Sequence, residues 1–328
     1  MSLVTVLATG GTIATRADAR GVGTAQDGGA DLVSRLDLPP DVQVRVEDVL
    51  RVGSYLMTLE RVHTLARRVA EVLQDPDVSG LVVTHGTDTT EETAYFLDLF
   101  HRDPRPVVVT GAQRPADARD SDGPRNLGDA VTVAASDAAR DLGVLVAFGG
   151  RVFPARGVRK SHTLAADTFA APDTGAVGWV HGNRVGVESR PRRHPALDLA
   201  AFDAAGLRVD IAACHPDADA VALRAFAAAG ARGIVLEATG AGNANPEICA
   251  AVAELTAAGI VVVTSTRVTA GPVTALYGNG GGADLLAAGA VPSGLLRPSQ
   301  ARVLVAALLG VHRDPATVRT EFLAHTVG

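Results

Sequence analysis

The sequence predicts an α/β protein with two domains, because short apolar segments alternate with longer amphipathic segments. The apolar segments are rich in valine and leucine and have the length of strands that are buried on both faces. The amphipathic segments have the length and spacing of helices, and this alternation is typical of a doubly wound parallel sheet. A chain of 328 residues, 47% of them hydrophobic, is long enough for about two such domains with buried cores.

The first domain is predicted to span residues 1–190. Its expected strands are Leu3–Ala8, Val42–Val46, Leu81–Thr84, Val107–Thr110 and Val144–Phe148. Its expected helices are Leu59–Leu73, Glu91–Phe100 and Asn126–Ala139. From Val152 to Glu188 glycines and turn residues interrupt the pattern, which favours a hairpin region that closes the domain.

Residues 191–207 form the predicted linker, which begins inside a cationic cluster that is interrupted by prolines. The smaller second domain, residues 208–328, repeats the α/β pattern. Its expected strands are Val209–Ala213, Gly233–Glu237 and Ile260–Ser265. Its expected helices are Ala218–Ala229, Pro246–Ala258 and a last pair from Gln300 onward.

The composition argues against several classes of partner. A net charge of −6 indicates no basic surface for nucleic acid or for an anionic membrane, so neither partner is expected. Cys214 and Cys249 are too few and too far apart in sequence for a disulfide framework or a Cys-x-x-Cys metal site. Met1 leads directly into a predicted strand, without the basic and apolar regions of a signal peptide. We therefore expect a cytoplasmic protein.

Three predicted strands end in turns rich in threonine and glycine, namely Thr9–Thr12, Thr84–Thr89 and Thr110–Ala112. Ligands bind at the carboxyl ends of the strands in open α/β sheets, so these turns are expected to converge on one crevice. The first turn does not resemble a nucleotide-binding loop, since neither G-x-x-x-x-G-K-[ST] nor G-x-G-x-x-G occurs near it. It either exposes Thr12 to a ligand or uses Thr12 as a helix cap.

The second turn offers the residue types of a proton relay. Thr89 and Glu92 are expected to form a capping box for the next helix, which leaves Thr87 and Asp88 free to point into the crevice. A threonine hydroxyl acts as a nucleophile or relay only when a base accepts its proton. Lys160, the only lysine of the chain, is a candidate base, because an amine can exchange a proton and a guanidinium cannot. A compositional bias against lysine is the competing explanation.

Three motifs in this order resemble the bacterial L-asparaginase and glutaminase-asparaginase family: TGGTIA, HGTDT and the stretch ARGVRKSHTLAADTFAAPDTGAVG. Five further motifs extend the resemblance over essentially the whole chain, namely VGSYLMT, VTGAQRP, SDGPRNL, GAGNAN and VTSTRV. The resemblance implies a larger flavodoxin-like domain, a smaller C-terminal α/β domain, and a homo-oligomer (dimer or tetramer) in which a C-terminal loop completes the neighbour's site. It implies hydrolysis of L-asparagine to L-aspartate and ammonia, with L-glutamine as a possible second substrate and no metal or organic cofactor.

The resemblance also assigns roles to single residues. It implies that Thr12 is the nucleophile and that Thr87, Asp88 and Lys160 move the proton. Ser54 would hold the α-carboxylate of the substrate and Asp88 its α-ammonium, while backbone N–H groups near Gly11 would stabilise the oxyanion. Whether Thr12 or water attacks the amide carbon stays open, and so does the preference between asparagine and glutamine.

This sequence departs from the family at three places. The segment Ile13–Leu32 contains no tyrosine, whereas the family's mobile segment carries one that contacts the nucleophile. Tyr55 replaces the glutamine that commonly follows the serine, and it would line the substrate pocket. The segment after Arg267 contains no glutamate that could reach the substrate ammonium of a neighbour. We predict that Tyr277 replaces the missing tyrosine and that Asn279 binds the ammonium.

Two other functions compete with hydrolysis. An amino-acid-binding regulatory module on the same fold would need the substrate clamp without turnover, but retention of Thr12, Thr87, Asp88 and Lys160 together argues against it. An amidase subunit that acts on aminoacylated RNA would need an extra N-terminal domain and a basic surface, and the sequence indicates neither.

Overall fold

The structure, a computed structural model, describes residues 1–18, 20 and 22–326. It divides into two compact units, Met1–Ala196 and Leu197–Gly328. In this described part of the chain, no helix combines the length and apolar character needed to cross a membrane.

The first unit is built on an eight-stranded mixed sheet with the strand order β12-β11-β8-β7-β6-β5-β1-β4. The strands are β1 (Ser2–Gly10), β4 (Val42–Val52), β5 (Val78–Thr84), β6 (Val107–Thr110), β7 (Val144–Phe148), β8 (Arg151–Pro154), β11 (Gly178–His181) and β12 (Arg184–Val187). The first five of these are parallel, and their order, β4-β1-β5-β6-β7, is that of a flavodoxin-like sheet. The expected hairpin region adds β8, β11 and β12 in antiparallel pairing.

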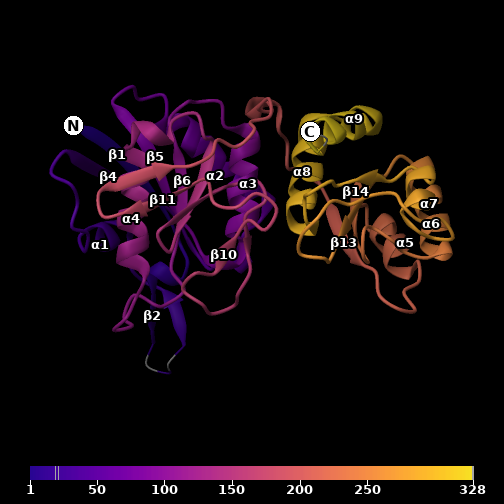
Figure 1. The fold of residues 1–328 in the computed structure, drawn as a ribbon, viewed down its shortest axis with the longest axis horizontal. Coiled ribbons are helices and arrows are strands. Elements are labelled where there is room, and N and C mark those ends of the chain that lie inside the picture. Colours follow the sequence, from indigo (N-terminus) through magenta and orange to yellow (C-terminus); the bar gives the residue numbers. More distant parts are fainter. Residues whose placement is uncertain (19, 21, 327–328) are drawn as a thin grey trace. The chain divides into compact units, whose positions relative to one another are not determined.

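Helices cover both faces of this sheet (Figure 1). They are α1 (Gly29–Val33), α2 (Leu59–Val72), α3 (Thr90–Phe100) and α4 (Gly123–Ala135). Helices α1 and α4 share a core with Val6, Val82 and Val108, whereas α2 and α3 pack together on the opposite face. Consequently the β6–α4–β7 connection has the opposite hand to the other three crossovers, which is rare in parallel sheets.

The start of the predicted linker is attached to the first unit. The Arg193 guanidinium donates to the backbone oxygen of His101 over 2.7 Å and lies 3.7 Å from the Asp98 carboxylate. Asp98 also accepts from the backbone N–H of Val144 over 2.9 Å. Burial raises the pKa of Asp98, because a charged carboxylate is costly away from water. The nearby Arg193 guanidinium offsets part of this cost.

The second unit has a four-stranded parallel sheet in the order β13-β14-β15-β16. Its strands are β13 (Val209–Ala213), β14 (Gly233–Ala238), β15 (Val261–Thr266) and β16 (Val291–Pro292). Its helices are α5 (Val221–Ala228), α6 (Pro246–Ala257), α7 (Gly282–Ala287), α8 (Pro298–Val311) and α9 (Pro315–Thr326). Helices α5 to α7 form one buried cluster with β14 and β15, and α8 packs on β13, β14 and β15.

The predicted α/β class is confirmed in both units. Strands β6, β7 and β13 have the predicted bounds. The other predicted strands and helices are displaced, extended or shortened at their ends. Several short elements were not predicted, because they lack a local period. These are the hairpin of β2 (Thr15–Ala17) and β3 (Gly23–Ala25), the ladder of β9 (Arg159–Lys160) and β10 (Phe169–Ala170), and the elements α1, α7 and β16.

Candidate active site

Chain turns after β1, β4, β5 and β6 meet at the carboxyl edge of the first sheet. A Cβ atom on Gly11 would lie 2.4 Å from the backbone nitrogen of Gly86, and one on Gly86 would lie 2.7 Å from Ser54 Oγ. A Cβ atom on Gly111 would lie 2.2 Å from the backbone oxygen of His85. Glycine is therefore required at each contact, and the predicted convergence of the turns is confirmed.

Thr12 opens a short 3-10 helix, η1 (Thr12–Ala14), directly after this contact. Gly11 is the N-cap of η1 and has a φ of 81°, so Thr12 is not the cap. The Thr15 hydroxyl donates to the Gly11 oxygen over 3.0 Å. The hydroxyl of Thr12 makes no hydrogen bond with any residue that the structure describes, which leaves it available to a substrate.

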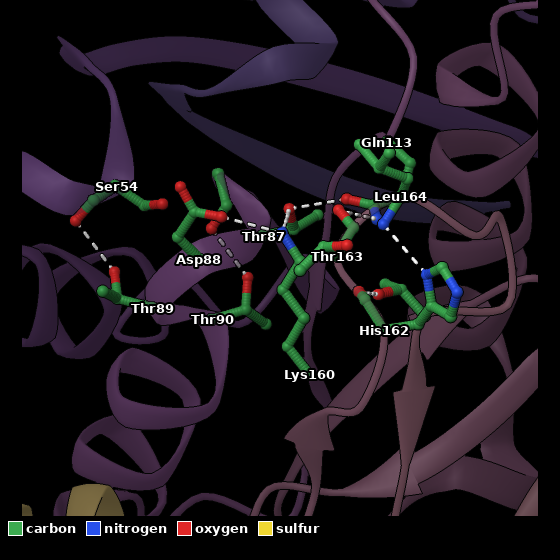
Figure 2. A network of polar contacts seen from close by, with 12 residues as sticks. Ser54, Thr87, Asp88, Thr89, Thr90, Gln113, Lys160, His162, Thr163 and Leu164 are labelled. Atoms are coloured by element: carbon green, nitrogen blue, oxygen red, sulfur yellow. Dashed lines mark hydrogen bonds and ion pairs between the residues drawn. The ribbon is translucent and has the colours of Figure 1, made fainter.

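Thr87, Asp88 and Lys160 form one chain of hydrogen bonds (Figure 2). Lys160 Nζ donates to Thr87 Oγ1 over 2.9 Å and to Asp88 Oδ1 over 2.7 Å. Thr87 is buried in the 3-10 helix η3 (Thr87–Thr89), while the side chains of Lys160 and Asp88 are 18% and 56% exposed. The structure thus joins residues more than seventy positions apart into the trio that the sequence suggested.

Two backbone contacts hold Lys160 in this place. The short strand β9, which contains Lys160, pairs with β10 so that Lys160 lies opposite Phe169. The backbone N–H of Lys160 donates to Glu91 Oε2 on α3 over 2.7 Å. The ammonium is therefore fixed both to the hairpin region and to the helix that follows the Thr87 turn.

The predicted capping box of Thr89 and Glu92 is wrong. The N-cap of α3 is Thr89, but its side chain makes no capping hydrogen bond and donates instead to the backbone oxygen of Ser54 over 2.9 Å. The hydroxyl of Thr90 donates to the Gly86 oxygen over 3.0 Å. The Thr89 hydroxyl therefore joins this turn to the Ser54 turn, whereas the Thr90 hydroxyl bonds within its own turn.

His85 bonds to the same turn from the buried side and was missed by the sequence analysis. It is completely buried, with Nδ1 2.7 Å from the Gly86 oxygen and Nε2 3.0 Å from the Thr93 hydroxyl. A carbonyl oxygen only accepts, so Nδ1 carries the proton and Nε2 accepts from Thr93. Burial lowers the pKa of His85 to about 4, which keeps the ring neutral. Its position directly before the Gly-Thr-Asp sequence was the available signal.

Acid is expected to destabilise the fold through His85 and His101. Burial lowers the pKa of both from 6.5 to about 4, so the unfolded chain binds more protons between these values and stability falls as the pH falls through this window. Each histidine should cost about 3 kcal/mol by pH 4. Urea unfolding between pH 7 and pH 4.5 measures the effect. His101→Gln should remove about half of the slope, and an identical slope in this variant would contradict the assignment.

Gln113 is a second residue that the sequence analysis did not place. The hydroxyl of Thr87 donates to Gln113 Oε1 over 2.8 Å, and Gln113 Nε2 donates to the backbone oxygen of Thr163 over 3.1 Å. The Asp122 carboxylate accepts from the backbone N–H groups of Gln113 and Arg114 at 3.0 and 2.9 Å. The signal was the motif VTGAQRP, which lies at the same sheet edge as the other turns.

Two family models match the chain almost from end to end. Residues 3–193 match the family described as Asparaginase, N-terminal, and residues 208–322 match the Glutaminase/Asparaginase C-terminal domain. The chain belongs to the asparaginase and glutaminase family. Among similar proteins, a probable periplasmic L-asparaginase of Haemophilus influenzae is 35% identical over 97% of this chain and 92% of its own length. L-asparaginase 2 of Escherichia coli is 34% identical over the same shares.

The fold agrees with a solved structure of the same family. The crystal structure of a probable cytoplasmic L-asparaginase from Campylobacter jejuni matches with a TM-score of 0.87 and 33% identity. The match covers 98% of this chain and 99% of that one. The asparaginase fold is therefore shown over 98% of this chain.

The remaining predicted residues of this family member lie in different places. Ser54 is buried, and its hydroxyl has no hydrogen-bond partner among the described residues. Tyr55 is largely exposed and leans back over Gly53. Tyr277 and Asn279 belong to the second unit, where both are exposed and Asn279 has a φ of 53°. No group of three or more His, Cys, Asp or Glu side chains suited to a metal occurs in the described part of this asparaginase-family chain.

Proposed function

We propose that the protein hydrolyses the side-chain amide of L-asparagine, giving L-aspartate and ammonia. The observation that carries this proposal is the hydrogen-bonded chain of Thr87, Lys160 and Asp88 beside the Thr12 turn. A hydroxyl, an amine and a carboxylate in direct contact are the parts of a proton relay, and a second hydroxyl next to it serves as the nucleophile. Membership of the asparaginase and glutaminase family points to the same amide chemistry.

In the proposed reaction, Thr12 Oγ attacks the amide carbon of asparagine and forms a tetrahedral intermediate. Backbone N–H groups of the glycine turns donate to the oxyanion, but not that of Gly11, which donates to the Val52 backbone oxygen over 3.0 Å. Thr87 takes the proton of the Thr12 hydroxyl and at the same time gives its own proton to the free amine of Lys160. Lys160 then passes a proton to the departing amide nitrogen. Ammonia leaves, and Thr12 carries an aspartyl ester.

Water completes the cycle by attacking this ester, with the same relay taking its proton. Aspartate and the Thr12 hydroxyl are then released, so one asparagine and one water give one aspartate and one ammonium ion. A route in which water attacks the amide directly uses the same relay and does not acylate Thr12. Trapping an acyl-enzyme by rapid acid quench distinguishes the two routes.

The substrate is held by groups on both sides of the relay. The buried hydroxyl of Ser54 is available to donate to the α-carboxylate, and Tyr55 lines the entrance beside it. The half-exposed Asp88 carboxylate binds the α-ammonium through an oxygen that is not occupied by Lys160. L-glutamine is one methylene longer, which changes binding by about 1 to 3 kcal/mol in a fitted pocket, and it is proposed as the weaker substrate.

A neighbouring copy of the chain is proposed to complete the site. We take the second domain as residues 208–328, after the linker 191–207. Its loop carries Leu276 and Tyr277, which are 62% and 61% exposed. Leu164, at the rim of the site in the first unit, is 80% exposed. Large exposed apolar side chains are expected to be covered in an assembly, here a homodimer or homotetramer. Tyr277 and Asn279 would then contact the neighbour's substrate. Two unpaired cysteines are compatible with the cytoplasmic location that we also propose.

Tyr277→Phe is expected to lower kcat by about 10-fold while leaving the assembly intact. The reason is that the lost phenol would support Thr12 by a hydrogen bond worth about 1.5 kcal/mol. Steady-state ammonia release and light scattering on the same sample measure both quantities. Tyr95→Phe is the matched control, since the Tyr95 hydroxyl is buried without a described partner and plays no part in the site. An unchanged kcat would assign Tyr277 to packing alone.

Ammonia release from free L-asparagine, measured beside L-glutamine and buffer, tests the proposed function. Release that accompanies equimolar aspartate is the expected result. Binding of aspartate or asparagine without any release would favour the alternative, an amino-acid-binding regulatory module on the same fold.

A further inference from the structure

Gln113 connects the candidate relay to a turn on the other side of the site (Figure 2). Its side-chain oxygen lies 2.8 Å from Thr87 Oγ1, and its side-chain nitrogen lies 3.1 Å from the backbone oxygen of Thr163. The amide of Gln113 is half-buried, so both of its polar atoms have well-defined protein partners.

The direction of each hydrogen bond in this chain follows from elementary rules. A backbone oxygen only accepts, so the NH₂ group of Gln113 must face Thr163 and its oxygen must face Thr87. An amide oxygen also only accepts, so the hydroxyl of Thr87 must donate to it. The lone pairs of Thr87 Oγ1 are then left to accept from Lys160 Nζ, which also donates to Asp88.

Both ends of the Gln113 bridge are held in place. On one side, Asp122 accepts from the backbone N–H of Gln113 over 3.0 Å and from Asn126 Nδ2 over 3.1 Å. On the other side, His162 Nδ1 accepts from the backbone N–H groups of Leu164 and Ala165 at 3.0 and 2.9 Å, which fixes the turn that presents the Thr163 oxygen. A bridge between two fixed turns has little freedom to reverse its direction.

We propose that Gln113 is a positioning residue that holds the Thr87 hydroxyl proton away from Lys160 and so sets the resting direction of the Lys160 to Thr87 hydrogen bond. The effect on enzyme kinetics rests on the proposed function. The direction of the hydrogen bond rests on the geometry alone. In the resting arrangement Lys160 is a donor. The relay operates only when the Thr87 hydroxyl turns from Gln113 to Lys160.

Without the Gln113 amide, the Thr87 hydroxyl is free to donate to Lys160 Nζ, and that bond forms only when Nζ carries a lone pair. The charged groups that surround Lys160 are Asp88, which accepts from Nζ, and Glu91, which accepts from its backbone N–H. Arg159, the preceding residue, lies 3.4 Å from Asp173, and His162 follows two positions later. These charges are the same with or without the Gln113 amide, so a change at Gln113 isolates the effect of the hydroxyl direction.

The structural consequence can be measured without enzymatic activity, because Lys160 is the only lysine. In protein labelled with [¹⁵N]lysine, its Nζ gives a single side-chain NMR signal that reports on its hydrogen bonds. At one fixed pH, Gln113→Met should move this signal by more than its linewidth, and Gln74→Met, at an exposed glutamine of the opposite sheet edge, should not. In a Thr87→Val background, Gln113→Met should have no further effect. An unmoved signal, or an equal movement without the Thr87 hydroxyl, would overturn the proposal.

The kinetic consequence is a shift of the pH profile. Gln113→Met should move the midpoint of the acid limb of kcat/KM to lower pH by about 0.4 to 1 pH unit, the equivalent of one lost hydrogen bond, and leave the plateau within about threefold. A uniform loss at every pH with an unmoved midpoint would mean that Gln113 only supports the turn. Gln113→Ala serves as a second variant, and thermal unfolding checks that both fold. If the wild-type chain releases no ammonia, the proposed function fails while the NMR measurement still decides the role of Gln113.

Discussion

Lys160→Arg is expected to lower kcat by about 100-fold or more in a protein that still folds. Arginine retains the positive charge, and with it the attraction to Asp88, but a guanidinium does not release a proton in proteins. The planar fork also does not fit the space of an ammonium that contacts Thr87 and Asp88 together. Loss of acid–base assistance alone accounts for a factor of about 10². Steady-state kinetics with asparagine measure the loss.

An exchange between arginine and lysine at an exposed position is the control for Lys160→Arg. Arg67 is exposed on α2, and Arg67→Lys should leave kcat unchanged. Thermal unfolding of both variants separates a loss of chemistry from a loss of fold. If the purified and folded Lys160→Arg protein kept more than about a tenth of wild-type kcat, Lys160 would not be the base of the reaction.

Thr12→Val is expected to abolish ammonia release, with kcat lowered by about 10³-fold or more, while aspartate still binds. Valine nearly retains the shape of threonine and removes only the hydroxyl, which makes no hydrogen bond within the described structure. The fold should therefore tolerate the change. Turnover measures the loss, and calorimetric titration with aspartate measures the retained binding.

The control for Thr12→Val is Thr64→Val, at an exposed helical threonine whose hydroxyl contacts only the Glu60 backbone oxygen. This variant should keep wild-type turnover. Wild-type turnover in Thr12→Val itself would place the nucleophile elsewhere, and Thr87→Val would then be the next variant to measure.

The candidate site could be predicted from the sequence to the extent that its parts are local. Thr87 and Asp88 were found because they directly follow a buried strand, and Lys160 was found because it is the only lysine. The same local reasoning failed for Thr89, whose sequence spacing fits a capping box but whose hydroxyl reaches Ser54. A capping pattern describes one helix end, whereas this bond depends on a turn that lies 35 residues earlier.

The roles of Tyr277 and Asn279 stay predictions. Both residues lie in the second unit, and their proposed contacts belong to a neighbouring copy of the chain. Sequence position suggested them, because the resemblance implies that this loop reaches the site of a neighbouring copy. The Tyr277→Phe measurement is the direct test of that suggestion.

The sequence by itself determined the fold class, the strands at whose ends the site lies, and the residue types of the relay. These follow from hydrophobic period, turn chemistry and composition, which act over a few residues. Only the tertiary structure decided that Gly11 touches Gly86, that His85 is buried neutral, and that the Thr87 hydroxyl donates to Gln113. The physical reason is that a hydrogen bond takes its direction from the partner across space, and these partners are brought together by the sheet order and not by the local chain.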